Sequence, residues 1–356
     1  MKKHLPDVVV TNLHRRYTGV SATVRALVPI QRQQADIGLL DTGDLGLGGE
    51  LSLWQVIRQG WSRPRSGPYR IWHARRDVEI LLGAFLRSVL RQPWRVLFTS
   101  AAPRRPGRVL QWTINLSDAI VATSERAAGF LSWHTCVIHH GVDTDWFTPP
   151  ADRTAALNKV WPDLNANGTQ RRAIGVFGRI RPSKGTDLAV SALLQVLPQH
   201  PDFVAFFTGL CQPSDRAYLQ KLGDQILAAG LSDRIRFVGD VPAEHIPDWV
   251  QAASVVVAAS RSEGFGLTPL EAMASGCAVV TSEAGVWPWV IDEQVGGLFQ
   301  TGSADDLAHV LASVIRRWES DPTWSERIRD HALKRHSIWT EATRLGFVYK
   351  QMHQGL

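Results

Sequence analysis

The chain repeats one pattern along most of its length: a largely apolar run, a loop, and a stretch with helical spacing. Such runs stand at Val8–Val10, Tyr69–Ala74, Arg95–Thr99, Ala119–Thr123, Val137–Ile138, Ala173–Phe177, Phe203–Gly209, Ile235–Val238, Val255–Ala259 and Val279–Thr281. Short apolar runs are typical of strands that are buried on both faces of a parallel sheet. Because strands alternate with helices, the sequence predicts an α/β fold of doubly wound parallel sheets.

The size of the chain indicates two domains. At 356 residues, 44% of them hydrophobic, it is longer than a single hydrophobic core usually supports. We expect a Rossmann-like domain over residues 1–150, a polar linker over 151–172 and a second Rossmann-like domain over 173–338. A last helix over 339–356 is expected to pack back on the first domain. Ligands are expected at the carboxyl ends of the strands, in a cleft between the domains.

Composition excludes several classes of protein and site. No apolar stretch reaches the roughly 18 residues of a membrane span, and Val8–Val10 is too short for the core of a signal peptide. Adjacent His139 and His140 point to opposite sides of an extended chain, so they are not expected to share a metal. The cysteines are few and far apart, which argues against a disulfide framework or a zinc site: Cys136, Cys211 and Cys277. We therefore expect a cytoplasmic protein.

Positive charge is concentrated in the first part of the chain. Residues 1–150 contain 19 Lys/Arg and 11 Asp/Glu (net +8), and the remainder contains 20 and 22 (net −2). This favours an anionic partner such as a phosphorylated lipid, membrane headgroups or nucleic acid; an ordinary solvated face is the alternative. Trp54 and Trp61 stand among arginines, as at a membrane interface or a base-stacking site, unless they anchor a partly ordered loop. The apolar helix expected over Val78–Arg91 either packs on the sheet or lies in a membrane interface.

Two loops have the composition of anion sites. In the first, Thr11–Val20, Gly19 precedes a helix that Ser21 is predicted to cap and Pro29 to end. A plain connection is the alternative, and the absence of GxGxxG spacing argues against a nicotinamide cofactor. The second loop, Gly178–Thr186, reads GRIRPSKGT. Its Arg179 and Lys184, with glycines nearby, suit a diphosphate. It lacks the spacing of a Walker A motif.

The stretch Ser260–Gly276, SRSEGFGLTPLEAMASG, follows an apolar run and combines a flexible turn with two carboxylates. Glu263 precedes the Gly-Phe-Gly turn, and Glu271 stands eight residues later, in a helix that begins near Thr268. Glycines let a ligand approach the backbone, and a helix start attracts negative charge. Thr268 and Glu271 also have the spacing of a capping box, so a purely structural role for Glu271 is the alternative.

Together these segments resemble a retaining glycosyltransferase of family 4, which has the two-domain GT-B fold. The resemblance covers nearly the whole chain and rests on the Gly19 loop, VIHHGVDTDWF (137–147), GRIRPSKG (178–185) and the pair Glu263/Glu271 within EGFGLTPLEAMASG. The segments FTSAAPRR, WHARRDVE and EGFGLTPLEAMA look most similar to bacterial lipopolysaccharide core mannosyltransferases that use GDP-mannose.

The resemblance implies a donor site in the second domain. Arg179 and Lys184 match the pair that binds the donor diphosphate and stabilises the departing nucleotide. Glu271 matches the carboxylate that holds the ribose hydroxyls, and Glu263 the one near the transferred sugar. With Arg179 and Lys184, Glu263 is the implied catalytic group. Further donor contacts are implied for Gly178, Gly239, Gly264, Phe265, Gly266 and Leu267.

The implied acceptor site lies in the first domain. Gly19 matches a glycine that lets the donor phosphates and acceptor come close, and His73 matches a histidine that contacts the acceptor or is structural. Arginines that suit an acceptor phosphate or sugar-acid carboxylate are Arg75, Arg76, Arg104 and Arg105. Where the family commonly has Thr-x-His, this chain reads Thr99-Ser100-Ala101, so the acceptor-activating residue has no match.

The expected function is transfer of a hexose, mannose from GDP-mannose, to a lipid-linked lipopolysaccharide core acceptor. No metal or other cofactor is expected, because two cations can stabilise a diphosphate leaving group. The basic first domain is expected to rest peripherally on the inner face of the cytoplasmic membrane. The alternatives are a UDP-sugar-dependent hexosyltransferase with another glycan or polyprenol-linked acceptor, a nucleic-acid binder without a known motif, and an inactive scaffold.

Overall fold

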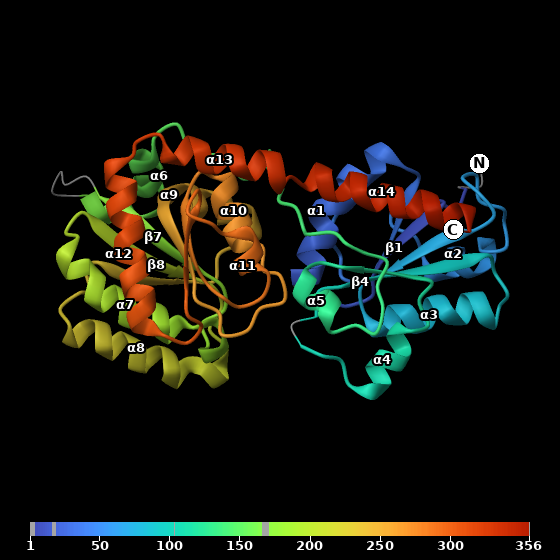
Figure 1. Cartoon of the computed structure of the whole chain (residues 1–356), viewed down its shortest axis with the longest axis horizontal. Coiled ribbons are helices and arrows are strands. Elements are labelled where there is room, and N and C mark those ends of the chain that lie inside the picture. Colours follow the sequence, from blue (N-terminus) through green and yellow to red (C-terminus); the bar gives the residue numbers. More distant parts are fainter. Residues whose placement is uncertain (1–3, 16–18, 103, 166–170, 356) are drawn as a thin grey trace. The chain divides into compact units, whose positions relative to one another are not determined.

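The structure, a computed structural model, describes residues 4–15, 19–102, 104–165 and 171–355. The chain forms two compact units, one of Met1–Gly141 with Ile338–Leu356 and the other of Val142–Ser337. Each unit contains one six-stranded sheet in which all strand pairs are parallel. Helices cover both faces of each sheet (Figure 1). The predicted architecture of two doubly wound parallel sheets is therefore confirmed.

The sheet of the first unit has the order β2-β1-β3-β4-β5-β6. Its strands are β1 (Val8–Asn12), β2 (Ile37–Asp41), β3 (Arg70–Ala74), β4 (Trp94–Ser100), β5 (Ala119–Ala122) and β6 (Cys136–Val137). Helices α1 (Gly19–Gln34) and α14 (Ile338–Gln354) pack together on one face, and α3 (Asp77–Ser88) packs on β3 and β4 beside α4 (Arg108–Ile114). The short helices are α2 (Leu53–Gln59) and α5 (Glu125–Gly129).

Alternation along each strand divides the core of the first unit into two clusters. Val8 and Val10 belong to the cluster beneath α1 and α14, whereas Val9 belongs to the cluster on the α3 side. Leu97 of β4 lies in the first cluster, and its neighbour Val96 in the second. Successive side chains of a strand point to opposite faces, so uninterrupted apolar runs supply both cores at once.

Helix α1 differs from the short helix that the sequence predicted. It begins at Gly19 and continues through Pro29 to Gln34, and Ser21 lies inside it, where its hydroxyl donates to Asn12. An interior proline removes one backbone hydrogen bond and costs about 3 kcal/mol. The buried face of α1, which includes Leu27, packs on the sheet and on α14, and this tertiary packing outweighs the local cost.

Buried Glu79 holds together the carboxyl ends of β1 and β3. This residue of α3 has no exposed surface, and its two carboxylate oxygens accept five hydrogen bonds. The donors are Thr11 Oγ1 (2.9 Å), Leu13 N (2.9 Å), Arg75 N (2.7 Å), Arg76 N (3.2 Å) and one Arg76 guanidinium nitrogen (3.2 Å). A buried charge is tolerated when its lone pairs are satisfied in this way. The loops that follow β1 and β3 therefore share one anchor.

The sheet of the second unit has the order β12-β11-β10-β7-β8-β9. Its strands are β7 (Arg172–Phe177), β8 (Phe203–Thr208), β9 (Ile235–Gly239), β10 (Ala253–Ala258), β11 (Ala278–Ser282) and β12 (Gly296–Phe299). Its helices are α6 (Arg153–Val160), α7 (Thr186–Val196), α8 (Arg216–Ala228), α9 (Ile246–Ala252), α10 (Thr268–Ala274), α11 (Trp287–Val290), α12 (Ala304–Ser320) and α13 (Trp324–Arg335). Helix α7 contacts α8 and α12, and α10 contacts α9 and α13.

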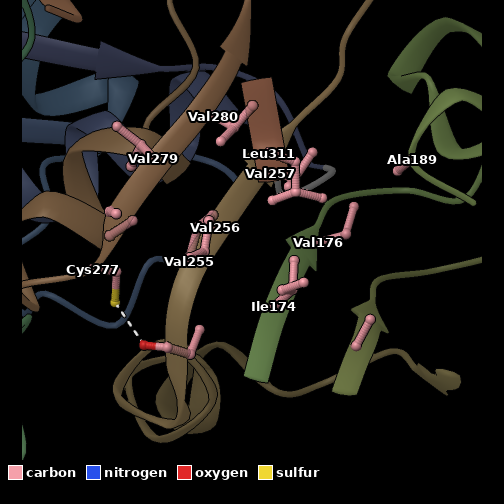
Figure 2. Close-up of a cluster of buried hydrophobic side chains, with 14 of the residues drawn as sticks. Ile174, Val176, Ala189, Val255, Val256, Val257, Cys277, Val279, Val280 and Leu311 are labelled. Atoms are coloured by element: carbon pink, nitrogen blue, oxygen red, sulfur yellow. Dashed lines mark hydrogen bonds between the residues drawn. The ribbon is translucent and has the colours of Figure 1, made fainter. Parts of the chain in front are cut away.

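Valines of the central strands fill the core of the second unit (Figure 2). Val256 and Val257 of β10 are almost fully buried, as are Val279 and Val280 of β11. Cys277, which precedes β11, is also buried, and its thiol donates to the carbonyls of Val250 and Ala253. β-Branched residues fit a sheet that is covered on both faces. The core thus gives a rigid base to the loops at the strand ends.

The predicted linker over residues 151–172 does not join the two units in its described part, 151–165 and 171–172; residues 166–170 lie outside the described residues. The chain passes between the units at Gly141/Val142 and at Ser337/Ile338, and α6 belongs to the second unit. Leu157 is buried in that core. The Arg153 guanidinium donates hydrogen bonds to the backbone carbonyls of Gln251, Ala253 and Ser275. The segment reads as a linker because it is polar, yet one buried leucine and one anchored arginine are enough to dock it.

The C-terminal helix α14 belongs to the first unit, where it packs on α1. Its Glu341 accepts hydrogen bonds from His140 Nδ1 (2.9 Å) and from Gly141 N (2.8 Å). His139 instead contacts Glu125, so the adjacent histidines face different groups, as predicted. Across the described residues, no helix combines the length and apolarity needed to cross a bilayer.

We expect Glu79→Ala to lower the free energy of unfolding by about 3–5 kcal/mol, because five donors lose a buried charged acceptor. Val78→Ala is the matched control, because Val78 is the adjacent residue of α3 and is exposed. Urea titrations of both variants measure the difference. Equal stability of the two variants would contradict the anchoring role of Glu79.

Candidate active site

The predicted donor residues gather at the carboxyl ends of two central strands of the second unit. Strands β7 and β10 pair directly, with Val176 opposite Val257. The loop Gly178–Gly185 follows β7, and the loop Ser260–Leu267 follows β10. Because parallel strands end at the same edge of a sheet, the two loops lie side by side.

Lys184 and Glu263 meet at this edge. Lys184 Nζ lies 2.5 Å from Glu263 Oε2, and Ser260 Oγ donates to the same oxygen (3.2 Å). Both side chains are partly exposed, so a ligand can reach them. A carboxylate that is already bonded to a lysine and a serine is not a free nucleophile. It can, however, exchange these bonds for hydroxyl groups of a ligand.

Arg179 presents an uncompensated charge beside this pair. The residue is exposed, and its guanidinium has no ion pair or hydrogen bond to any described residue. Gly178, just before it, is exposed, and a Cβ at Gly178 would lie 4.0 Å from Lys184 Cδ. The Lys184 stem therefore passes close to the backbone at Gly178. Gly239, at the end of β9, also faces open space on its Cβ side.

The Gly-Phe-Gly turn presents its backbone rather than its aromatic ring. The Phe265 ring is buried and packs edge-on against Trp287, with 5.9 Å between ring centroids. Gly266 has φ +74°, and a Cβ there would come within 3.2 Å of Glu263 and Trp287 side-chain atoms. Glycine is therefore required at this position by the fold itself. Gly264 and Leu267, on either side, are partly exposed.

Glu271 is not part of a capping box. Helix α10 has Leu267 at its N-cap, Thr268 is its first residue, and no side chain caps the helix. Nor does any described residue bond to the Glu271 carboxylate. The residue keeps a little exposed surface, but protein surrounds the carboxyl group, and this burial raises its pKa to about 7. The site thus contains an acceptor group to which no described residue donates a hydrogen bond.

The predicted acceptor residues lie in the first unit, where two of them are enclosed. His73 has no exposed surface: Nδ1 lies 2.7 Å from the Tyr349 hydroxyl and Nε2 lies 2.7 Å from Thr99 Oγ1. Burial, and then the charge of Arg75, lowers the pKa of His73 well below 6.5. The expected contact between His73 and an acceptor does not fit this geometry, because both ring nitrogens are occupied. The structural alternative does.

Arg75 is also buried, with one guanidinium nitrogen donating to Thr23 Oγ1 (3.1 Å) and two nitrogens without a partner. Arg76 is partly exposed and pairs with Glu79 and Asn12. By contrast, Arg104 and Arg105 are exposed and have no partner among the described residues. Only these last two have fully accessible charges.

Gly19 is the first residue of α1 and is exposed. A Cβ at this position would meet no atom within 4 Å, so packing within the chain does not require glycine there. Ala101, just after β4, is partly exposed and offers no side chain for proton transfer.

Comparison with known proteins decides the family. A model described as glycosyl transferases group 1 matches residues 161–331. The chain is 37% identical to the lipopolysaccharide core biosynthesis mannosyltransferase LpcC of Rhizobium leguminosarum bv. viciae, over 97% of this chain and 96% of the relative. It is 36% identical to the corresponding enzyme LpsB of Rhizobium meliloti (strain 1021), over 97% of each chain. The chain belongs to the group 1 glycosyl transferases.

The fold of this glycosyltransferase agrees with that assignment. The structure of HepE from Anabaena in complex with UDP matches it with a TM-score of 0.77, over 96% of this chain and 98% of that one. At 20% sequence identity this likeness concerns the fold alone. The two parallel-sheet units therefore form the GT-B fold, and the expectation of a glycosyltransferase enzyme is confirmed.

The sequence did not reveal the contacts that fasten the two site loops of the transferase to each other. The Arg261 guanidinium forms a forked ion pair with Asp187 of α7 (2.8 and 2.7 Å), and Arg261 N donates to Ser183 O (3.0 Å). Tyr218 of α8 donates to Asp187 (2.8 Å). The Arg261 guanidinium beside Asp187 helps to hold the pKa of that carboxyl below its usual value against the opposing effect of burial. These groups set the separation of Lys184 and Glu263.

One group of possible metal ligands lies elsewhere in the transferase. Among the described residues, ligand atoms of His4, Asp7 and Asp36 lie within 4.8 Å of one another, near the amino ends of β1 and β2. The Asp7 carboxylate already accepts from Arg65 N, Ser66 N and Ser66 Oγ. This group lies in the first unit, at the amino ends of its strands, whereas the donor loops follow the carboxyl ends of strands in the second unit.

The raised pKa of Glu271 has a consequence for stability. Since its pKa is about 7 in the folded chain and 4.5 in the unfolded one, its stabilising effect is complete below pH 4.5 and is lost as pH rises through 7. We expect the free energy of unfolding of Glu271→Gln, relative to that of the wild type, to increase by about 1–3 kcal/mol from pH 5 to pH 8. Urea titrations at both pH values measure this, with exposed Glu244→Gln as the control. A difference between Glu271→Gln and wild type that does not change with pH would contradict the shift.

Proposed function

We propose that this glycosyltransferase moves mannose from GDP-mannose to a lipid-linked lipopolysaccharide core acceptor, with retention of anomeric configuration. The observation that carries the proposal is the similarity, over nearly the whole of each chain, to two lipopolysaccharide core mannosyltransferases. The geometry of the strand ends in the second unit supports it. There one edge of the sheet holds the Lys184–Glu263 pair, together with Arg179 and the Glu271 carboxylate, which have no partner in the part of the chain that the structure describes.

For the donor, we propose that Arg179 and Lys184 bind the diphosphate. Arg179 supports this role because its charge is exposed and unpaired among the described residues. Lys184 already has an anionic partner, Glu263, and a diphosphate brings a stronger one. As the sugar leaves, negative charge grows on the diphosphate, and two fixed cations stabilise it most at that point. We propose that this step requires no metal ion.

For the ribose and the sugar, we propose the two carboxylates of the β10 edge. The Glu271 carboxylate accepts no hydrogen bond from the described residues, and ribose hydroxyls would supply donors to it. Glu263 would exchange Lys184 for hydroxyl groups of the sugar. The backbone of Gly264, Phe265, Gly266 and Leu267, with Gly178 and Gly239, would line the donor. Glu263 is held by two partners, so we propose that the acceptor attacks the face from which the diphosphate departs.

For the acceptor, we propose the basic residues of the first unit. Arg104 and Arg105 are exposed and suit phosphate or sugar-acid groups. Arg76 pairs with Glu79, so its side chain would have to leave this ion pair to bind the acceptor. Helix α1 begins at the exposed Gly19, and the first N–H groups of a helix attract an anion. Arg75 and His73 are buried and would have a structural role in the first unit rather than contact the acceptor. With a lipid-linked acceptor, we place the enzyme peripherally on the inner face of the cytoplasmic membrane.

A direct comparison of donors tests the proposed substrate. We expect GDP-mannose to be used with a kcat/KM at least about tenfold above that of UDP-glucose, since a site that hydrogen-bonds one base discriminates against another. The assay follows release of GDP or UDP in the presence of core oligosaccharide acceptor. Preference for UDP-glucose would replace the proposal with the UDP-sugar alternative. Binding of DNA or RNA without turnover of either donor would reject the proposed reaction.

Removal of the proposed donor contacts tests the site. We expect Lys184→Ala to lower kcat about 10²–10³-fold, because a cation that stabilises the leaving group is lost. Glu271→Ala is expected to raise the donor KM strongly. Lys159→Ala is the matched control, because Lys159 is an exposed lysine of the same unit that pairs with Asp248. Circular dichroism checks folding of each variant. Undiminished transfer in both site variants would reject the proposed donor site.

A further inference from the structure

Helix α3 presents an apolar stripe to solvent. Val78, Leu81, Phe85 and Val89, at the end of the helix, are 52%, 43%, 46% and 62% exposed. Their spacing of three and four residues places all four on one side of the helix. The buried residues of α3, including Ile80, lie on the opposite side and form part of the core. The helix is therefore docked on the sheet by one face and leaves a second apolar face uncovered.

Helix α4 extends this surface. It contacts α3, and the two helices lie next to each other in the first unit (Figure 1). Val109 and Trp112 of α4 are 80% and 59% exposed. We call these two residues and the four of the α3 stripe the α3–α4 patch. Large apolar side chains exposed together on two packed helices mark an interaction site more often than chance exposure.

The surroundings of the α3–α4 patch are basic. Residues 77–118 contain six arginines and three acidic residues, a net charge of +3; of the acidic residues, Glu79 is buried and Asp118 pairs with Arg87. Arg91, Arg104, Arg105 and Arg108 are exposed without an ion-pair partner among the described residues. Trp61 lies beside the end of α3, more than half exposed, with its indole nitrogen donating to Leu90 O (3.0 Å). It does not anchor the core, as one reading of the sequence allowed.

We propose that the α3–α4 patch docks on a lipid bilayer that carries anionic headgroups. The apolar side chains would enter the boundary between headgroups and acyl chains, the arginines would contact the headgroups, and Trp61 would lie at the interface. A second copy of the chain is less compatible with the charge. A two-fold contact through this patch would bring the same arginines of both copies together. The inference deepens the proposed function, because it assigns the surface that brings the enzyme to a lipid-linked acceptor.

Co-sedimentation with vesicles tests the docking surface directly. We expect the wild type to bind vesicles of phosphatidylcholine and phosphatidylglycerol about tenfold more tightly than vesicles of phosphatidylcholine alone, and less tightly at high salt. The double variant Phe85→Ser/Val89→Ser is expected to lose about tenfold or more of that binding. Arg108→Glu is expected to weaken binding to the anionic vesicles only.

Matched controls lie in the second unit. Leu227→Ser replaces an apolar residue of α8 that is 68% exposed, and Arg316→Glu replaces an exposed arginine of α12. Both are expected to bind vesicles like the wild type. Vesicle binding that the patch variants leave unchanged would overturn the inference. So would absence of vesicle binding, and so would a dimer, detected by sedimentation velocity, that the patch variants dissociate.

The same variants separate this inference from the proposed function. With a delipidated core oligosaccharide as acceptor, Phe85→Ser/Val89→Ser is expected to transfer at the wild-type rate, because no bilayer is involved. Loss of vesicle binding with normal transfer supports the docking surface. Vesicle binding by a wild type that transfers no sugar would leave the patch supported and the proposed function rejected.

Discussion

The parallel pairing of β7 with β10 is the constraint on which the proposed donor site depends. Val176 lies opposite Val257, so the two strands end together and their loops emerge side by side. The strands themselves are buried in a valine-rich core, which fixes their positions closely. Lys184 and Glu263 are 79 residues apart in sequence, yet this pairing brings their charged atoms to 2.5 Å. The Arg261–Asp187 ion pair then holds the loops themselves.

The site combines satisfied and unsatisfied groups in a way that suits a polar, charged ligand. Glu263 is satisfied by Lys184 and Ser260, while Arg179 and Glu271 have no partner among the described residues. A free cation and a free, partly protonated carboxylate are costly in a folded chain without ligand. A nucleotide-sugar would supply an anion to one and hydroxyl donors to the other. The groups proposed to bind the donor are therefore the same groups that lower the stability of this edge of the sheet.

In the first unit, the many arginines divide into two groups. Arg70 is fully buried and donates to the backbone, and Arg76 is bound by Glu79. The exposed arginines near α3 and α4 have no such partners among the described residues, and they surround an apolar surface. The net charge of +8 over residues 1–150 therefore overstates the charge that a partner meets, but the part that remains is concentrated. A local cluster of exposed positive charge attracts an anionic partner more effectively than the same net charge spread over the chain.

The sequence by itself predicted two doubly wound parallel sheets, the loops that carry Arg179, Lys184 and Glu263, and the helix that carries Glu271, but it missed the strands β2 and β12. The predicted features depend on local periodicity and on short spacings, which are visible along the chain. Only the tertiary structure decided that His73 is enclosed by Tyr349, 276 residues away, and that Arg261 holds Asp187, 74 residues away. The tertiary structure also decided that the polar helix α6 packs on the core of the second unit and that α1 continues past Pro29. Contacts between distant residues leave no periodic signal, because burial and pairing are settled only when the sheets and helices pack together.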